Sequence, residues 1–92
     1  MGFEFDPNKS AINKAKHGIS FIEAQEIWAG VYITVPLGNK HGEERHAVFG
    51  KIGGKHWTAI IAWRNENIRI ISVRRSRAKE EAYYARKKGN QC

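Results

Sequence analysis

The spacing of hydrophobic residues predicts four β-strands in the middle and later parts of the chain. They are expected over residues 31–37, 43–52, 55–64 and 68–73, where β-branched and aromatic residues recur. Gly53 and Gly54 separate the second strand from the third and are typical of a two-residue hairpin turn. Pro36 suits an edge strand, because proline has no N–H to offer to a neighbour. Residues 38–42 and 65–66 supply the other turns, and such short connections make the sheet mostly antiparallel.

Helical signals lie on both sides of these strands. Asp6 can cap a helix over residues 7–16, with Pro7 at its first position and Gly18 at its end. Ser20 and Glu23 form a capping box for a second helix that ends at residue 30. Alanines at helical spacing predict a third helix from residue 78 onward. The expected fold is therefore α+β in one domain over residues 1–92: two N-terminal helices, a four-stranded mostly antiparallel sheet and a C-terminal helix.

Turn lengths predict which side chains share a face of the sheet. If Gly53 and Gly54 form the loop, Ile52 pairs with Lys55, and a two-residue turn at 65–66 extends the register to the last strand. The first face then carries Val48, Trp57, Ala59, Ile61, Trp63, Ile68, Ile70, Ser72 and Arg74, with both tryptophans in the core. The second face carries Arg45, Ala47, Phe49, Ile60, Ala62, Arg64, Arg69, Ile71 and Val73. An odd loop length would swap the faces of the last strand.

The first helix is expected to place a thin apolar side against the protein. That side is formed by Ala11, Ile12 and Ala15, whereas Lys9, Asn13 and Lys16 form a polar stripe.

Charge narrows the function classes. Sixteen Lys and Arg against nine Asp and Glu give a net charge of +7, which favours nucleic acid as a partner, although an acidic protein would also fit. No apolar run approaches the length of a membrane span, and no secretory signal is seen, so the cytoplasm is the expected location. Cys92 is the only cysteine and excludes an internal disulfide.

No cofactor is expected from the motifs. The four histidines lack zinc-site spacing, and no glycine-rich nucleotide-binding loop is present. Gly50, Gly53 and Gly54 are attributed to a hairpin. Many arginines with a few histidines and carboxylates suit a metal-free ribonuclease, in which the 2′-hydroxyl of RNA attacks the adjacent phosphorus. A non-catalytic nucleic-acid-binding module needs the same arginines, and charge alone favours that alternative.

Three segments carry a family resemblance. They are FDPNKSAINKAKHGISFIEA at residues 5–24, then Glu44, Arg45 and Gly50, and finally Arg64, IRIIS at residues 68–72, Arg74, Glu80 and Tyr84. In this order and spacing the chain resembles the BrnT family of bacterial type II toxins. The resemblance implies a RelE-like fold and an endoribonuclease that arrests growth. It also implies a BrnA-like antitoxin with a ribbon-helix-helix DNA-binding part, which covers the toxin in an assembly with two copies of each. No metal is implied.

The candidate site residues combine this resemblance with phosphate chemistry. Arg45, Arg64 and Arg74 are candidates for binding the scissile phosphate, and surface salt bridges, such as Arg45 with Glu43 or Glu44, are the alternative. His17 and His41 are candidate proton shuttles; His17 also suits a purely structural role at a helix C-terminus.

Further basic residues are expected to bind RNA; they are Lys16, Arg69, Arg75 and Arg77. Arg75 and Arg77 suit antitoxin docking as well. Glu80 and Tyr84 lie one turn apart, so they are expected to pack the last helix onto the sheet or to orient an arginine.

Overall fold

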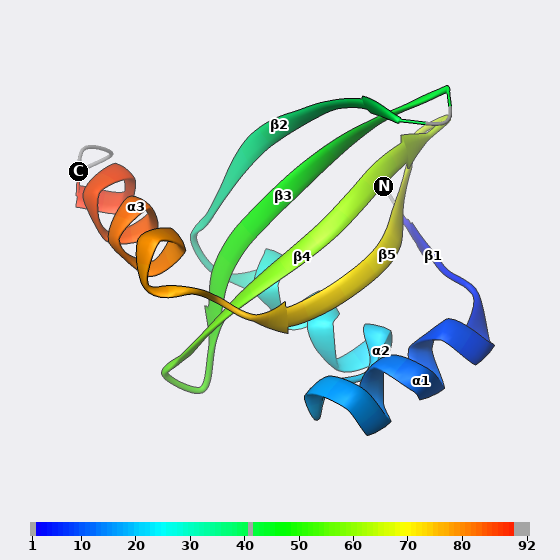
Figure 1. Ribbon diagram of the computed structural model, residues 1–92, viewed down its shortest axis with the longest axis horizontal. Helices are drawn as coiled ribbons and strands as arrows, with labels where there is room; N and C mark the ends of the chain where they lie inside the picture. The colour runs from blue at the N-terminus through cyan, green and yellow to red at the C-terminus, as the bar shows by residue number, and fades with distance from the viewer. Residues whose placement is uncertain (1, 41, 90–92) are drawn as a thin grey trace.

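The computed structural model describes residues 2–40 and 42–89 (Figure 1). In these residues the elements are, in order, β1 (Phe3–Glu4), α1 (Pro7–His17), α2 (Phe21–Ala24), the 3-10 helix η1 (Gln25–Ala29), β2 (Tyr32–Lys40), β3 (Glu43–Ile52), β4 (Lys55–Arg64), β5 (Asn67–Arg75) and α3 (Ala78–Gly89). The α+β class is confirmed. The second predicted helix differs in detail, because only its first turn is α-helical and the rest is 3-10. None of the helices described is long and apolar enough to cross a membrane.

The sheet is mixed rather than purely antiparallel. Its strand order is β1-β5-β4-β3-β2, and β1 pairs in parallel with β5 through Phe3–Ile68 and Glu4–Arg69. The prediction of four strands is therefore wrong by one, because a two-residue strand is too short for a periodicity to reveal. Its one signal is the alternation of Phe3, Glu4 and Phe5: both phenylalanines pack on the core, and Glu4 bonds Arg69.

The edge strand β2 is longer than expected. Pro36 lies in this edge strand as predicted, but residues 38–40 continue the strand instead of forming a loop. Pro36 pairs with His46 and Gly38 pairs with Arg45, so the register shifts between them and Leu37 is an extra residue.

The β3–β4 hairpin matches its prediction. Ile52 pairs with Lys55, and the pairing continues without interruption to Arg45 and Ala62. Gly53 and Gly54 have φ values of 56° and 82°, the left-handed backbone that a two-residue hairpin of this kind requires.

A β-bulge in β5 overturns the predicted faces of its last residues. Ile70 pairs with Ile61 as expected, but Ser72 pairs with Ile60, so Ile71 is an extra residue. Beyond the bulge every side chain changes face. Val73 therefore lies in the first-face core, and Arg74 lies on the second face opposite Thr58. The turn length alone carried no information about this insertion.

Helix α1 is attached by polar side chains, which reverses the prediction. Ile12 is 60% exposed, and Ala11 and Ala15 are exposed too, whereas Asn13 is only 6% exposed. Asn13 donates to the carbonyl oxygens of Ile19 (2.8 Å) and Val73 (2.9 Å) and accepts from the N–H of Val73 (3.1 Å). The side-chain amide of Asn13 thus bonds the backbone of β5 as a neighbouring strand would, directly after the bulge.

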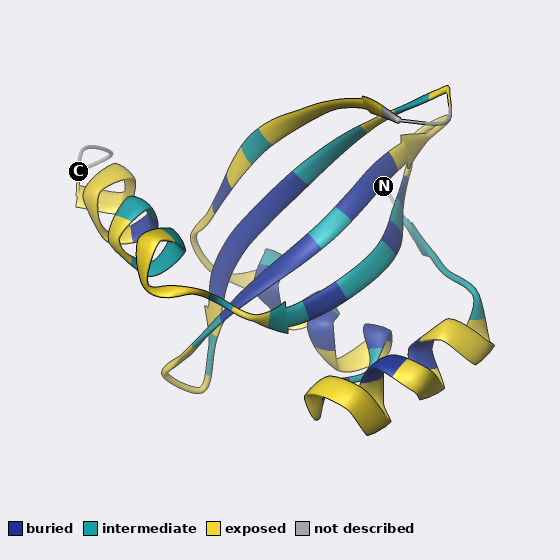
Figure 2. Cartoon of the chain, viewed as in Figure 1, coloured by how far each residue is buried: buried dark blue, intermediate teal, exposed yellow. Residues whose placement is uncertain are grey.

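Two apolar clusters lie on the two faces of the sheet. Figure 2 shows the buried residues along the middle strands that contribute to them. On the first face, side chains from α2 and η1 pack on the strands, with Ile19, Phe21, Ala24, Ile27, Val48, Trp57, Ala59, Ile61, Ile68, Ile70 and Val73 buried. On the second face, α3 covers a smaller cluster of Ile33, Ala47, Phe49 and Tyr84.

One glycine and one tryptophan matter for how the core is packed. Gly50 lies in β3, within the strand predicted over residues 43–52; a Cβ there would lie 2.7 Å from Cγ2 of Ile27, so the glycine lets η1 approach the sheet. Trp57 is 8% exposed as predicted, but Trp63 is 48% exposed, so its placement in the core is wrong. Trp63 lies at the end of β4, next to the β4–β5 turn.

Replacement of Asn13 by alanine should lower the free energy of unfolding by about 2–3 kcal/mol, because both backbone groups of Val73 would lose their partner. Urea denaturation measures the change. Asn8→Ala on the same helix is the control and should change stability by less than about 0.5 kcal/mol. Equal effects of the two substitutions would contradict a clamp at Asn13.

Candidate functional site

Three arginines gather on the second face, at the end of the sheet near the β4–β5 turn. Arg45 pairs with Ala62, Ala62 pairs with Arg69, and Arg64 lies two residues further along β4. Neighbouring strands are about 4.8 Å apart, so the backbones of Arg45 and Arg69 lie about 10 Å from each other. We call Arg45, Arg64 and Arg69 the arginine cluster. Helix α3 lies toward the opposite end of the sheet and leaves the cluster uncovered (Figure 1).

The three members of the arginine cluster differ in their partners. Nε of Arg64 donates to Glu43 at 3.0 Å, and Arg69 donates to Glu4 at 3.5 Å. Arg45 has no carboxylate partner among the residues described, and its Nε is buried without a hydrogen bond. A buried charged donor without an acceptor is costly, so an anion at this position would be stabilised. The alternative of an Arg45 salt bridge to Glu43 or Glu44 is not what the structure has.

Glu4 is a member of this site that sequence reasoning missed. It reaches the cluster because β1 pairs with β5 beside Arg69. The alternation of Phe3, Glu4 and Phe5 was the available signal, but the distant pairing partner was not visible in it.

Arg74 lies outside the arginine cluster. It pairs with Thr58, four residues along β4 from Ala62, or about 13 Å away. Its two terminal nitrogens bond the two carboxylate oxygens of Glu80 at 2.7 and 2.8 Å. This bidentate contact joins α3 to the sheet. Glu80 therefore has both roles expected of it, because the same contact packs the helix and orients an arginine.

The carboxylate of Glu80 is strongly held in its charged form. The guanidinium of Arg74 lowers the pKa of Glu80 from 4.5 to about 2, and bonds from the N–H of Arg77 and the hydroxyl of Thr58 act in the same direction. The same contact raises the pKa of Arg74. Tyr84, one turn further, donates to the carbonyl oxygen of Val31 at 3.0 Å and joins α3 to the start of β2.

His17 and Lys16 lie together, apart from the arginine cluster. They line a cavity of about 190 Å³ between α1 and the bulge of β5, which we call the edge pocket. Its lining residues are Lys9, Ile12, Asn13, Lys16, His17, Phe21, Ile71 and Ser72. No ion pair or hydrogen bond is found in the described ranges for the side chains of Lys9, Lys16 and His17.

The other predicted basic residues lie at the α3 end of the sheet. The guanidinium of Arg75 stands 5.4 Å from the ring centroid of Trp57, and its Nε donates to the carbonyl oxygen of His56. Arg77 is exposed, directly before α3. His41 lies outside the described residues.

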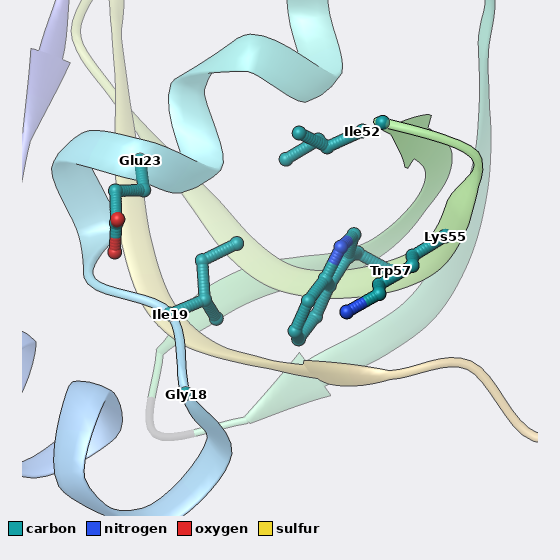
Figure 3. Close-up of a pocket in the computed structure, with 7 residues that line it drawn as sticks. Gly18, Ile19, Glu23, Ile52, Lys55 and Trp57 are labelled. Carbon is teal, nitrogen blue, oxygen red and sulfur yellow. The ribbon is translucent and has the colours of Figure 1, made fainter.

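A cavity of about 300 Å³ separates α2 from the β3–β4 hairpin (Figure 3). Ile19, Ile52 and Trp57 point into it. Glu23 also lines the cavity, and its carboxylate accepts hydrogen bonds from Nζ of Lys14 at 2.8 Å and from the N–H of Ser20. The bond from Lys14 lowers the pKa of Glu23 to about 2. None of the predicted site residues lines this cavity. Across residues 2–40 and 42–89, no three His, Cys, Asp or Glu side chains are grouped as a metal site requires.

The chain matches a known protein family over most of its length. Residues 5–80 match a family model described as the ribonuclease toxin, BrnT, of type II toxin–antitoxin systems. No curated protein sequence matches the chain significantly. The matched range includes the whole arginine cluster and the edge pocket.

Glu80→Gln should destabilise the protein in a pH-dependent way. The folded-state pKa lies below the unfolded value, so the carboxylate stabilises the fold above about pH 4.5 and loses this effect as the pH falls toward 2. We expect a loss of about 1–2 kcal/mol at pH 7, reduced by solvent screening near the surface, and convergence with the wild type at low pH. Chemical denaturation across this range measures it. Glu26→Gln, at an exposed carboxylate, is the control, and a difference that stays constant with pH would contradict the assignment.

Proposed function

Because the chain belongs to the BrnT family of ribonuclease toxins of type II toxin–antitoxin systems, we propose that it is a metal-independent endoribonuclease that works through 2′-hydroxyl attack. The observation that carries the proposal is Arg45, a guanidinium without a carboxylate partner among the described residues, which lies beside two further arginines on an open sheet surface. This is the arrangement that a phosphodiester needs while negative charge develops on its oxygens.

The proposed reaction divides into three tasks. The 2′-oxygen attacks the adjacent phosphorus as its proton passes to a base, and the bond to the 5′-oxygen breaks as that oxygen takes up a proton. The products are a 2′,3′-cyclic phosphate and a 5′-hydroxyl end. Arg45 binds the phosphate oxygens, and Arg64 and Arg69 add charge by exchanging their bonds to Glu43 and Glu4 for bonds to RNA.

Proton transfer is proposed for His41, as predicted from the sequence, and for Glu43, which lies beside Arg64. His17, the other predicted proton shuttle, lies in the edge pocket rather than at the arginine cluster, so it is not given this role. Arg74 stays a predicted catalytic residue. Its bidentate bond to Glu80 supports an indirect role, in which it holds α3 away from the open part of the second face.

A non-catalytic nucleic-acid-binding module is the second candidate. It is favoured by the same open arginines and by the net charge of +7. It differs in one measurable respect, because binding alone leaves the RNA intact.

Arg45→Ala should lower the rate of RNA cleavage by about 100-fold, because the phosphate would lose its main charged donor. The assay uses purified protein, single-stranded RNA and EDTA, and it identifies the cyclic phosphate ends. Arg86→Ala on α3 removes the same charge far from the cluster and should retain most of the activity. RNA that stays intact with the wild type, while still binding in a salt-sensitive way, would support the second candidate instead.

The partner is proposed to be a BrnA-like antitoxin with a ribbon-helix-helix DNA-binding part. A type II toxin implies an antitoxin that neutralises it. Arg75 and Arg77 lie at the α3 end of the sheet, away from the arginine cluster, and this position favours antitoxin docking over RNA contact.

Co-expression with the product of the adjacent gene should give a stable complex with two copies of each chain and no ribonuclease activity. Light scattering after size-exclusion chromatography measures the mass. Separate elution of the two chains at micromolar concentration would contradict the partner, and a one-to-one mass would contradict only the stoichiometry.

A further inference from the structure

The edge pocket combines an apolar floor with a cationic rim. Ile12, Phe21 and Ile71 supply the apolar part, and Lys9, Lys16 and His17 supply the basic part. No carboxylate lines it. By contrast, Lys14 on the same helix lies outside the pocket and is paired with Glu23 at 2.8 Å. The two lysines that line the pocket, Lys9 and Lys16, have no such carboxylate partner among the described residues.

The orientation of these basic side chains is set by Asn13. Residues three and four positions apart lie on one face of a helix. Lys9, Lys16 and His17 stand at these distances from Asn13, which is bonded to the backbone of Val73 in β5. The contact that attaches α1 to the sheet therefore turns all three basic groups toward the bulge.

Helix stability does not explain this arrangement. Cations are favourable at the C-terminal end of a helix, which accounts for Lys16 and His17. Lys9 lies in the first turn of α1, where the helix dipole disfavours a cation. The carboxylate at this end of the helix, that of the N-cap Asp6, accepts from the N–H of Asn8 and forms no ion pair with Lys9. A negatively charged ligand in the pocket would offset that cost.

The edge pocket is also close to the arginine cluster. Ser72 lines the pocket and lies on the second face, opposite Ile60. It follows Arg69 by three residues along β5, a distance of about 10 Å at most. A chain of nucleotides bound at the cluster can therefore cross the edge of β5 and enter the pocket.

We propose that the edge pocket binds a nucleotide of the RNA next to the one cleaved, with Lys9 and Lys16 on a phosphate group and the apolar floor against the sugar or base. This inference rests on the proposed ribonuclease function and adds a second binding position to it. It assigns His17 to the rim of that position as a phosphate contact.

The first test measures binding without cleavage. A fully 2′-O-methylated single-stranded RNA lacks the attacking hydroxyl, and its affinity can be followed by fluorescence anisotropy at several salt concentrations. Each lost phosphate contact reduces the slope of log affinity against log salt by about 0.7 for single strands. Lys9→Gln with Lys16→Gln should therefore reduce the slope by about 0.7–1.4. Lys51→Gln with Lys55→Gln removes the same charge at the β3–β4 hairpin and should leave the slope near the wild-type value.

The second test compares substrate lengths. A dinucleotide carries only the scissile phosphate and offers no second phosphate group to Lys9 and Lys16, whereas a ten-nucleotide RNA offers one on either side. The Lys9/Lys16 variant should lose several-fold more kcat/KM on the longer RNA than on the dinucleotide, and the hairpin variant should show no such difference. Circular dichroism confirms that both variants are folded.

The outcomes separate the two proposals. An unchanged salt slope in the Lys9/Lys16 variant would overturn the edge pocket, even if RNA is cleaved normally. A reduced slope in a protein that never cleaves RNA would support the pocket and reject the ribonuclease. Normal RNA binding with lost binding of the co-expressed antitoxin would also overturn the proposal and assign this surface to the protein partner.

Discussion

The bulge in β5 and the Asn13 amide that holds it determine how the basic residues of this protein are distributed. One extra residue, Ile71, moves Arg74 to the face that carries Arg45 and brings Val73 into the opposite core. Strand β1 pairs with β5 only at Ile68 and Arg69, so the backbone of Val73 has no strand neighbour on that side. Asn13 supplies its partners, and a helix with an exposed apolar side is thereby fastened to the sheet. Because buried backbone groups must be paired, this polar contact is as necessary as the apolar core.

Charge pairing divides the arginines into different classes. Arg74 is neutralised by Glu80 in a bidentate contact, and Arg64 and Arg69 hold single carboxylates. Arg45 has none among the described residues. Net charge suggests only that a polyanion binds; the pairing pattern singles out Arg45 within the arginine cluster. Arg45 lies where α3 does not cover the sheet.

Helix α3 sets the boundary of that open surface. The Arg74–Glu80 contact and the bond from Tyr84 to Val31 place the helix over Phe49 and Ala47. Between Ile60 and the β4–β5 turn, the second face is not covered by α3 and carries Arg45, Arg64 and Arg69. The cluster and the edge pocket then lie on either side of the β5 edge, linked by Ser72. The proposed path of RNA follows from this link.

Local signals in the sequence determined the helix caps, the Gly53–Gly54 hairpin, the β3 and β4 boundaries and the family. Each of these depends on neighbouring residues, as when Asp6 bonds the N–H of Asn8 or when two glycines adopt a left-handed backbone. Tertiary structure alone decided the parallel pairing of β1, the bulge at Ile71, the burial of Asn13 and the partners of the arginines. Several of these features depend on contacts between residues far apart in the chain, such as Asn13 with Val73 and Glu4 with Arg69, which are about sixty positions apart. A bulge shifts register by one residue without changing composition or turn length, so the face on which Arg74 lies could be settled only by the packed chain.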